Sequence, residues 1–166
     1  MGTRPDPNWN RWILQSIIDH YKTNVVDPNT VPFLVDGVDT RDETWMNQPD
    51  RVELRVNGPD TKEISARCWR IWVGVNIYLT SMMGQESKNR YDLENMVGLF
   101  LEYTDIVIPV YRLGTGVDDD DTLVGCLEPR RELPNAVRCV HFGQISPDEL
   151  IKQAQIDARY EMYVYV

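Results

Sequence analysis

The sequence contains few of the side chains that build redox, metal and acid–base sites. Its 166 residues include three cysteines and two histidines. Cys68, Cys126 and Cys139 are odd in number and form no Cys-x-x-Cys pair, which argues against a zinc motif or a disulfide framework. All three lie in apolar stretches, so we expect buried free thiols in a reducing compartment.

Common catalytic and ligand-binding motifs are also missing. The sequence has no G-x-S-x-G, and the glycines at 114 and 116 are followed by aspartates where a phosphate loop needs other residues. The run Asp36–Glu43 lacks the residue order of a calcium loop, so we expect a solvated loop. We interpret His20, near a helix end, as a surface or capping residue and His141, in a strand, as structural. We predict no catalytic residue, no cofactor and no metal ligand, and therefore a protein that is not an enzyme.

Positive charge is scarce, and no apolar run is long. The chain has 17 Lys and Arg against 26 Asp and Glu, a net charge of −9 and a pI near 4.7. Proteins that grip a phosphate backbone concentrate basic residues, so this composition argues against nucleic-acid binding, although DNA could slide past such a surface. We see neither a signal peptide nor a membrane span, and we expect synthesis into the cytoplasm.

What the chain does have is the size and composition of one globular domain. With 42% hydrophobic and 26% charged residues, it is expected to fold as a single domain over 1–166. We expect an N-terminal arm at 1–8 and an acidic loop at 114–122.

The strongest pattern is the period-two alternation of Ile64–Thr80. Odd positions from Trp69 to Leu79 are all apolar, whereas the even positions are mixed. This predicts a strand with one face on a core and one on a wetter surface. At about 3.3 Å per residue it would span roughly 55 Å, so it either bends at Gly74 or extends to a neighbouring molecule.

Other segments complete an α+β pattern. Helical spacing predicts one helix at about 9–22, capped by Asn8, and a second at 90–104, capped by Asn89. The capping box Ser146–Glu149 predicts a short helix toward Gln153. Strands are expected at 31–35, 51–57, 106–113, 122–127, 137–142 and 154–166, with a turn at 57–60 that pairs 51–57 antiparallel with the long strand. The predicted fold is a mostly antiparallel sheet with one very long strand, backed by two main helices and one short helix.

Two charged segments have alternative interpretations. Asp118, Asp119, Asp120 and Asp121 could form a solvated hairpin tip, or an acidic rim that faces the lumen or a docking partner of an oligomer. Arg130 and Arg131 form the most basic spot of the chain, and could meet an acidic partner or simply lie in an exposed loop.

The order of these elements resembles that of the tail terminator (tail-completion) proteins of long-tailed bacteriophages and their neighbours in the head–tail neck. The resemblance covers nearly the whole chain and is carried by the following segments: the helix Trp9–Tyr21, the strands Arg51–Asn57 and Ile64–Thr80, the helix Arg90–Thr104 and the closing Ala154–Val166.

The resemblance implies a structural virion protein, made in the host cytoplasm, whose copies close into a ring, commonly of six. Such a ring caps the tail tube, contacts the tail tube protein and a neck or head-completion protein, and lets DNA pass without specific binding. Abundant Tyr, Trp and Met are typical of interface cores, and an acidic ring leaves passing DNA unbound. The side chains that we expect at the subunit interface are Arg70, Trp72, Asn76, Tyr78, Tyr163 and Tyr165.

Three other functions remain open at this point. The chain could be another neck component, an adaptor or stopper. It could be a small metal-dependent hydrolase that uses loop carboxylates, or a monomeric acidic regulator such as a nucleic-acid mimic. The predicted interface residues could also be covered by another part of the same chain.

Overall fold

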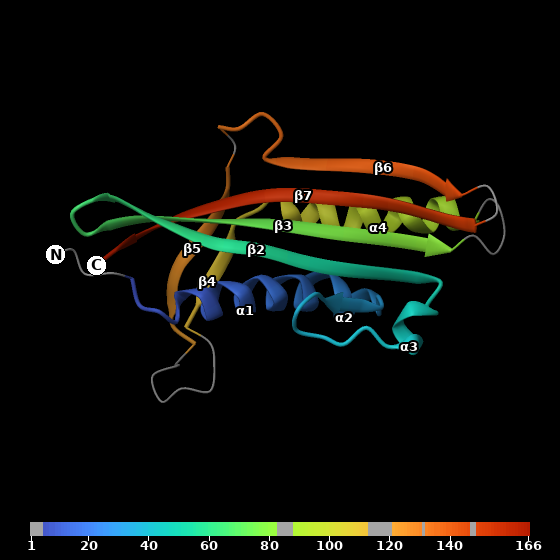
Figure 1. Ribbon diagram of the computed structural model, residues 1–166, viewed down its shortest axis with the longest axis horizontal. Coiled ribbons are helices and arrows are strands. Elements are labelled where there is room, and N and C mark those ends of the chain that lie inside the picture. Colours follow the sequence, from blue (N-terminus) through green and yellow to red (C-terminus); the bar gives the residue numbers. More distant parts are fainter. Residues whose placement is uncertain (1–4, 83–87, 113–120, 131, 147–148) are drawn as a thin grey trace.

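The computed structural model describes residues 5–82, 88–112, 121–130, 132–146 and 149–166. It is a single α+β domain in which the two main helices pack on one side of a seven-stranded sheet (Figure 1). The predicted fold class is confirmed. The strands are β1 (Phe33–Val35), β2 (Asp50–Ser65), β3 (Cys68–Met82), β4 (Ile108–Tyr111), β5 (Leu123–Pro129), β6 (Val137–Ser146) and β7 (Glu149–Tyr165). The helical segments are α1 (Trp9–Tyr21), the π-helical η1 (Lys22–Val26), α2 (Asp27–Asn29), α3 (Glu43–Met46) and α4 (Lys88–Thr104).

The sheet is centred on three long antiparallel strands. Its strand order is β1-β2-β3-β7-β5-β4, and β6 also pairs with β7. β3 pairs along its whole length with β7, and β2 pairs with the other edge of β3. Only β1, which joins β2 at the edge, runs parallel to its partner among the described strand pairs. The short strands β4 and β5 leave the main sheet and run beside α1 (Figure 1).

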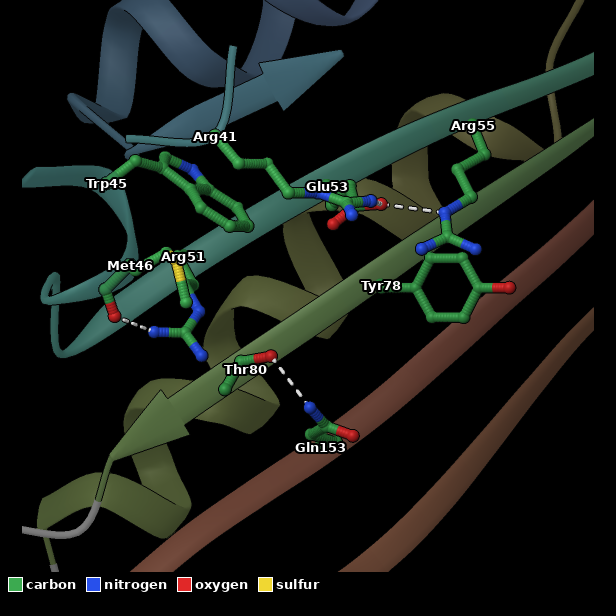
Figure 2. Close-up of a pocket in the computed structure, with 9 residues that line it drawn as sticks. All are labelled: Arg41, Trp45, Met46, Arg51, Glu53, Arg55, Tyr78, Thr80 and Gln153. Atoms are coloured by element: carbon green, nitrogen blue, oxygen red, sulfur yellow. Dashed lines mark hydrogen bonds and ion pairs between the residues drawn. The ribbon is translucent and has the colours of Figure 1, made fainter. Parts of the chain in front are cut away.

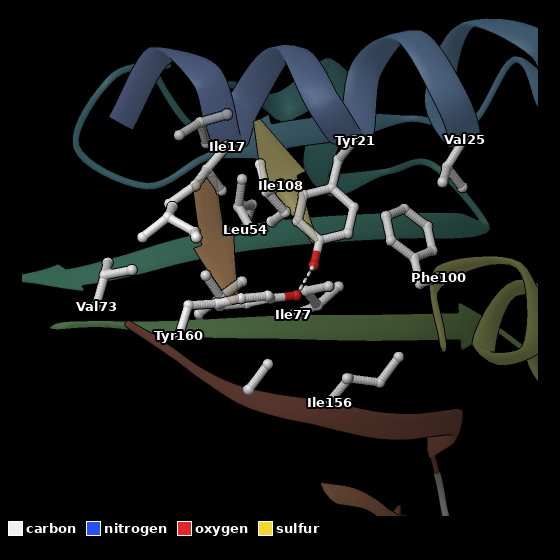
Figure 3. Close-up of a cluster of buried hydrophobic side chains, with 14 of the residues drawn as sticks. Ile17, Tyr21, Val25, Leu54, Val73, Ile77, Phe100, Ile108, Ile156 and Tyr160 are labelled. Carbon is white, nitrogen blue, oxygen red and sulfur yellow. Dashed lines mark hydrogen bonds between the residues drawn. The ribbon is translucent and has the colours of Figure 1, made fainter. Parts of the chain in front are cut away.

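The core fills the space between the sheet and the two main helices. The inward positions of β3 contribute the apolar series that the alternation predicts: from Ile71 to Leu79 each is at most 1% exposed, whereas Trp69 at its start is half-buried. Helical spacing on α1 and α4 brings further apolar side chains onto the same cluster (Figure 3). The central members are Ile13, Ile17, Tyr21, Ile71, Val73, Val75, Ile77, Leu79, Val97 and Phe100.

A polar link is buried inside this core. The Tyr160 hydroxyl donates to the Thr104 carbonyl, and the Tyr21 hydroxyl lies 3.0 Å from Thr104 Oγ1. The two tyrosine hydroxyls are 3.5 Å apart (Figure 3). Burial raises the pKa of both tyrosines, so they remain neutral donors. The link joins α1, α4 and β7, which are distant in sequence.

Four local predictions were wrong. The chain does not turn at 57–60, because β2 continues through a bulge between Asn57 and Asp60 and turns at 66–67 instead. Gly58, at φ +96°, adopts the backbone conformation that the bulge requires. The partner strand β3 has no register shift at Gly74 in its pairing with β7. Ile64 therefore belongs to β2, and the long strand begins at Cys68.

The second error concerns the short helix predicted from Ser146, where β6 instead runs to Ser146 and β7 starts at Glu149. Pairing with β3 and β6 on both edges overrides the local capping signal. The third concerns the cysteines: Cys126 is exposed, and Cys68 and Cys139 are half-buried, all three as free thiols. The fourth is the Asn89 cap, since α4 already begins at Lys88; Asn8 does take the N-cap position of α1, although its side chain makes no capping hydrogen bond.

The buried tyrosine link yields a stability prediction. Tyr160→Phe removes the hydroxyl that satisfies the Thr104 carbonyl, and should lower the free energy of unfolding by about 1–2 kcal/mol in chemical denaturation. The matched control, Tyr111→Phe, alters a tyrosine that is 37% exposed and should change stability by less than about 0.5 kcal/mol. Equal effects of the two substitutions would contradict the assigned role of Tyr160.

Candidate assembly face

The side of the sheet opposite α1 and α4 carries a broad polar and aromatic surface, which we call the open face. Side chains alternate along a strand, so the positions between the core residues of β2, β3 and β7 all point to this side. The open face comprises Arg51, Glu53, Arg55, Asn57, Asp60 and Lys62 of β2, then Arg70, Trp72, Gly74, Asn76, Tyr78 and Thr80 of β3, and Gln153, Gln155, Asp157, Arg159, Glu161, Tyr163 and Tyr165 of β7.

The structure brings the six predicted interface residues together on the open face. Register places Arg70 opposite Tyr163 and Trp72 opposite Glu161; Asn76 and Tyr78 follow on the same face of β3, and Tyr165 follows on that of β7. The four residues of β3 are half-buried by their strand neighbours, whereas Tyr163 and Tyr165 are 49% and 79% exposed. A sheet face with this many aromatic side chains is of the type found at interface cores.

An ionic cluster lies where β7 meets β5. The Glu161 carboxylate accepts hydrogen bonds from Arg70, and Arg130 Nε lies 3.3 Å from the same oxygen. The hydrogen bond to Glu161 raises the pKa of the Arg70 guanidinium. Arg130, predicted to meet an acidic partner, thus has an acid from its own chain beside it. Arg131 lies outside the described residues.

Amide side chains connect the middle of the three strands. Asn57 Nδ2 donates to Asn76 Oδ1, and Asn76 Nδ2 donates to Asp157 Oδ1. Gln155 Nε2 donates to the same Asp157 oxygen at 2.5 Å. These bonds run across β2, β3 and β7 and hold the flat, polar centre of the open face in one conformation.

An arginine pocket occupies the other end of the open face, where α3 overhangs β2 (Figure 2). It has a volume of about 260 Å³. Arg51 stacks on Trp45, with 5.4 Å from its Cζ to the ring centroid, and Arg55 stacks on Tyr78 at 4.7 Å. The remaining lining residues are Arg41, Met46, Glu53, Thr80 and Gln153.

Glu53 organises the arginines of this pocket. Its side chain is 11% exposed, and Oε1 accepts from Arg41 Nη2 at 2.6 Å and from Arg55 Nε at 2.7 Å. This hydrogen bond raises the pKa of Arg55. Asp36 also contacts both arginines at the rim, at 3.1 and 3.6 Å. The guanidinium groups are thus held in fixed positions, with planar surfaces and N–H donors directed to the pocket.

Sequence reasoning missed the pocket as a site. The alternation of Arg51, Glu53 and Arg55 between apolar residues indicated a strand, and placed these three side chains on one face. Their stacking partners are Trp45, which comes from α3, and Tyr78, which comes from the next strand. The stacked pairs form only when the folded chain brings α3 and β3 next to these residues of β2.

Other predicted residues lie elsewhere. Asp118, Asp119 and Asp120 are outside the described residues, while Asp121 is exposed and its backbone N–H donates to the Arg112 carbonyl. His20 is half-buried, not superficial, and its Nε2 lies 2.8 Å from the Tyr103 carbonyl. Burial lowers the pKa of His20. His141 is exposed and its Nε2 lies 3.1 Å from Glu94 Oε1.

Two other kinds of feature are absent from the part of the chain that the structure describes. No group of three or more His, Cys, Asp or Glu side chains there could hold a metal ion. Among the described helices, none is both long enough and apolar enough to cross a membrane.

Comparisons with known proteins give no family. No family model and no curated protein matches the sequence. Several solved chains match, and one of them shares 13% identity with a TM-score of 0.49, over 92% of this chain and 97% of that chain.

The position of Glu53 leads to a prediction. Glu53→Gln removes the charge that two arginines share, and should lower the free energy of unfolding by about 1 kcal/mol, since both arginines are more than 40% exposed and screened by solvent. Glu63→Gln, on the exposed part of β2, is the control and should be neutral. Urea denaturation at two salt concentrations measures both. A stability loss that is unchanged at high salt would contradict an ionic role for Glu53.

Proposed function

We propose that this protein is a structural subunit whose copies assemble into a ring through the open face, as a tail terminator at the head–tail junction of a long-tailed bacteriophage. In this role the ring caps the tail tube, joins it to the neck and lets DNA pass. The virion is then its final location. The observation that carries the proposal is the open face itself, an aromatic and arginine-rich sheet surface that, among the described helices, only α3 overhangs, at the arginine pocket.

The projecting end of the sheet supports the same role. The β2–β3 hairpin extends past the start of α1 (Figure 1), and residues 60–67 are all exposed. β1 covers the outer edge of β2 only at residues 52–54. The C-terminal end of β7 lies along this arm, and the backbone N–H of Val166 donates to the Arg67 carbonyl. An extended arm with exposed tyrosines is suited to contact a neighbouring subunit.

The net charge is consistent with a passage for DNA. Each copy carries −9, so a closed ring multiplies an acidic field around its opening. Repulsion from such a field would keep the phosphate backbone from binding to the wall. The proposal that the ring is a tail terminator comes from the resemblance in element order. The net charge and the open face are consistent with that proposal.

The first test is the mass of the particle in solution. Light scattering coupled to gel filtration should give about 116 kDa for six copies of a 19.3 kDa chain. Negative-stain images should show rings with a central opening. A monomer at concentrations up to about 100 µM, both alone and with tail tubes, would overturn the proposal.

Trp72 provides the mutational test. Its side chain lies half-buried at the middle of the open face, and Trp is a residue type that dominates interface energies. Trp72→Ala should weaken ring formation at least about tenfold while the monomer keeps its circular dichroism spectrum. Leu123→Ala is the control, since Leu123 is 53% exposed on β5, away from the open face. A normal ring for Trp72→Ala at micromolar concentration would count against this interface.

A further inference from the structure

Charge is distributed unevenly between the open face and the rest of the chain. The open face carries five Lys and Arg against four Asp and Glu, a formal charge of +1. The remaining twelve basic and twenty-two acidic residues of the sequence carry −10. The basic members are Arg51, Arg55, Lys62, Arg70 and Arg159, and the acidic members are Glu53, Asp60, Asp157 and Glu161. An open face of this charge is complementary to the acidic remainder of an identical chain.

The outer side of α4 offers a matching acidic surface. The sequence has no Lys or Arg between 91 and 105. The exposed residues of this stretch follow helical spacing on the outer side of the helix, and Glu94 lies at its edge, 3.1 Å from His141 of β6. They are Glu94, Asn95, Gly98, Glu102 and Asp105, the last just beyond the helix.

Gly98, at the centre of this surface, has no packing role within the chain. A Cβ built at Gly98 would meet no atom of the described residues within 4 Å, and its φ is not positive. Glycine inside a helix is less stable than alanine. Within one chain this glycine therefore only destabilises α4. The close approach of another molecule is a physical reason for a residue without a side chain at this position.

We infer that, in the ring proposed above, the open face of one copy binds the outer side of α4 of the next copy. This inference rests on the proposed function and names the partner surface. The contact is heterologous, since two different surfaces of the chain meet, and contacts of this type generate rings when the rotation closes. A helix of the next copy that packs on the open face would bury the aromatic side chains of that face. In the same way, α1 and α4 bury the apolar side chains on the other side of the sheet.

The arginine pocket supplies the chemistry for the carboxylates of α4. Arg51 donates to the Met46 carbonyl and lies flat on Trp45, while Arg55 is directed by Glu53 and lies on Tyr78. Each guanidinium has five N–H donors in a planar fork. The N–H groups of Arg51 and Arg55 that are not used in hydrogen bonds within the chain can therefore donate to a carboxylate of Glu102 or Asp105 from the next copy.

The sharpest test is Gly98→Ala, because the two effects expected of it have opposite signs. The alanine should raise the melting temperature of the dissociated chain through helix propensity. It should also weaken ring assembly about tenfold or more, because a methyl group would separate the two surfaces. Gln15→Ala is the control, a change to alanine at an exposed position of α1 that lies outside the α4 surface and should leave assembly unchanged. Stronger or unchanged assembly of Gly98→Ala would overturn the inference.

A complementation experiment tests the pairing of the two surfaces. One variant reverses the charge of the open face by Arg51→Glu and Arg55→Glu, and the other reverses that of α4 by Glu102→Arg and Asp105→Arg. Each should be monomeric alone. An equimolar mixture should assemble into particles of at least a heterodimer in light scattering, since it restores one intact open face with one intact α4 surface, and the two reversed surfaces are also opposite in charge. If charge reversal unfolds a variant, glutamine replaces the new residue.

The outcomes separate this inference from the proposed function. If the native chain forms rings and the α4 variant does so equally well, the α4 contact is wrong and the ring proposal stands. If the open-face variant is monomeric and the mixture gives no heterodimer, the contact is between two open faces, and the inference is again overturned. A native chain that never assembles overturns both.

Discussion

The arrangement of this protein depends on one geometric constraint, the alternation of side chains along β3. β3 is paired on both edges, so its side chains can leave only above and below the sheet. Five apolar residues on one side, from Ile71 to Leu79, hold α1 and α4 through burial of apolar surface. The same constraint forces Arg70, Trp72, Asn76 and Tyr78 onto the opposite side. The core and the open face are therefore two consequences of a single pattern.

The two faces differ in how their polar groups are satisfied. On the core side, Tyr21, Thr104 and Tyr160 bond to one another and to backbone away from water. On the open face, the polar groups pair along the surface, as Glu53 does with Arg41 and Arg55. Their stacked rings and guanidinium groups remain partly accessible. A surface that is already ordered loses less entropy on association than one with free side chains. This favours binding of a rigid element such as a helix.

Much of this could be predicted from sequence, because alternation and helical spacing are local signals. The two main helices, the edge strand near Leu34 and the placement of Trp72 and Tyr78 on a polar face all followed from them. The signals failed where pairing over long distances decides the structure. Ser146 begins a good capping box, yet it ends a strand because β7 is paired on both edges. The arginine pocket was missed because Trp45 and Tyr78 reach Arg51 and Arg55 only after the chain has folded.

The position of β7 has a consequence for how the chain folds during synthesis. β7 is the last strand in the sequence, yet it lies at the middle of the sheet, between β3 on one edge and β6 and β5 on the other. Until a ribosome has released this segment, one long edge of β3 has no partner and its apolar face is incomplete. Contacts over such a distance along the chain also form slowly. A chain in which β7 has not yet paired is thus exposed to edge-to-edge aggregation along β3.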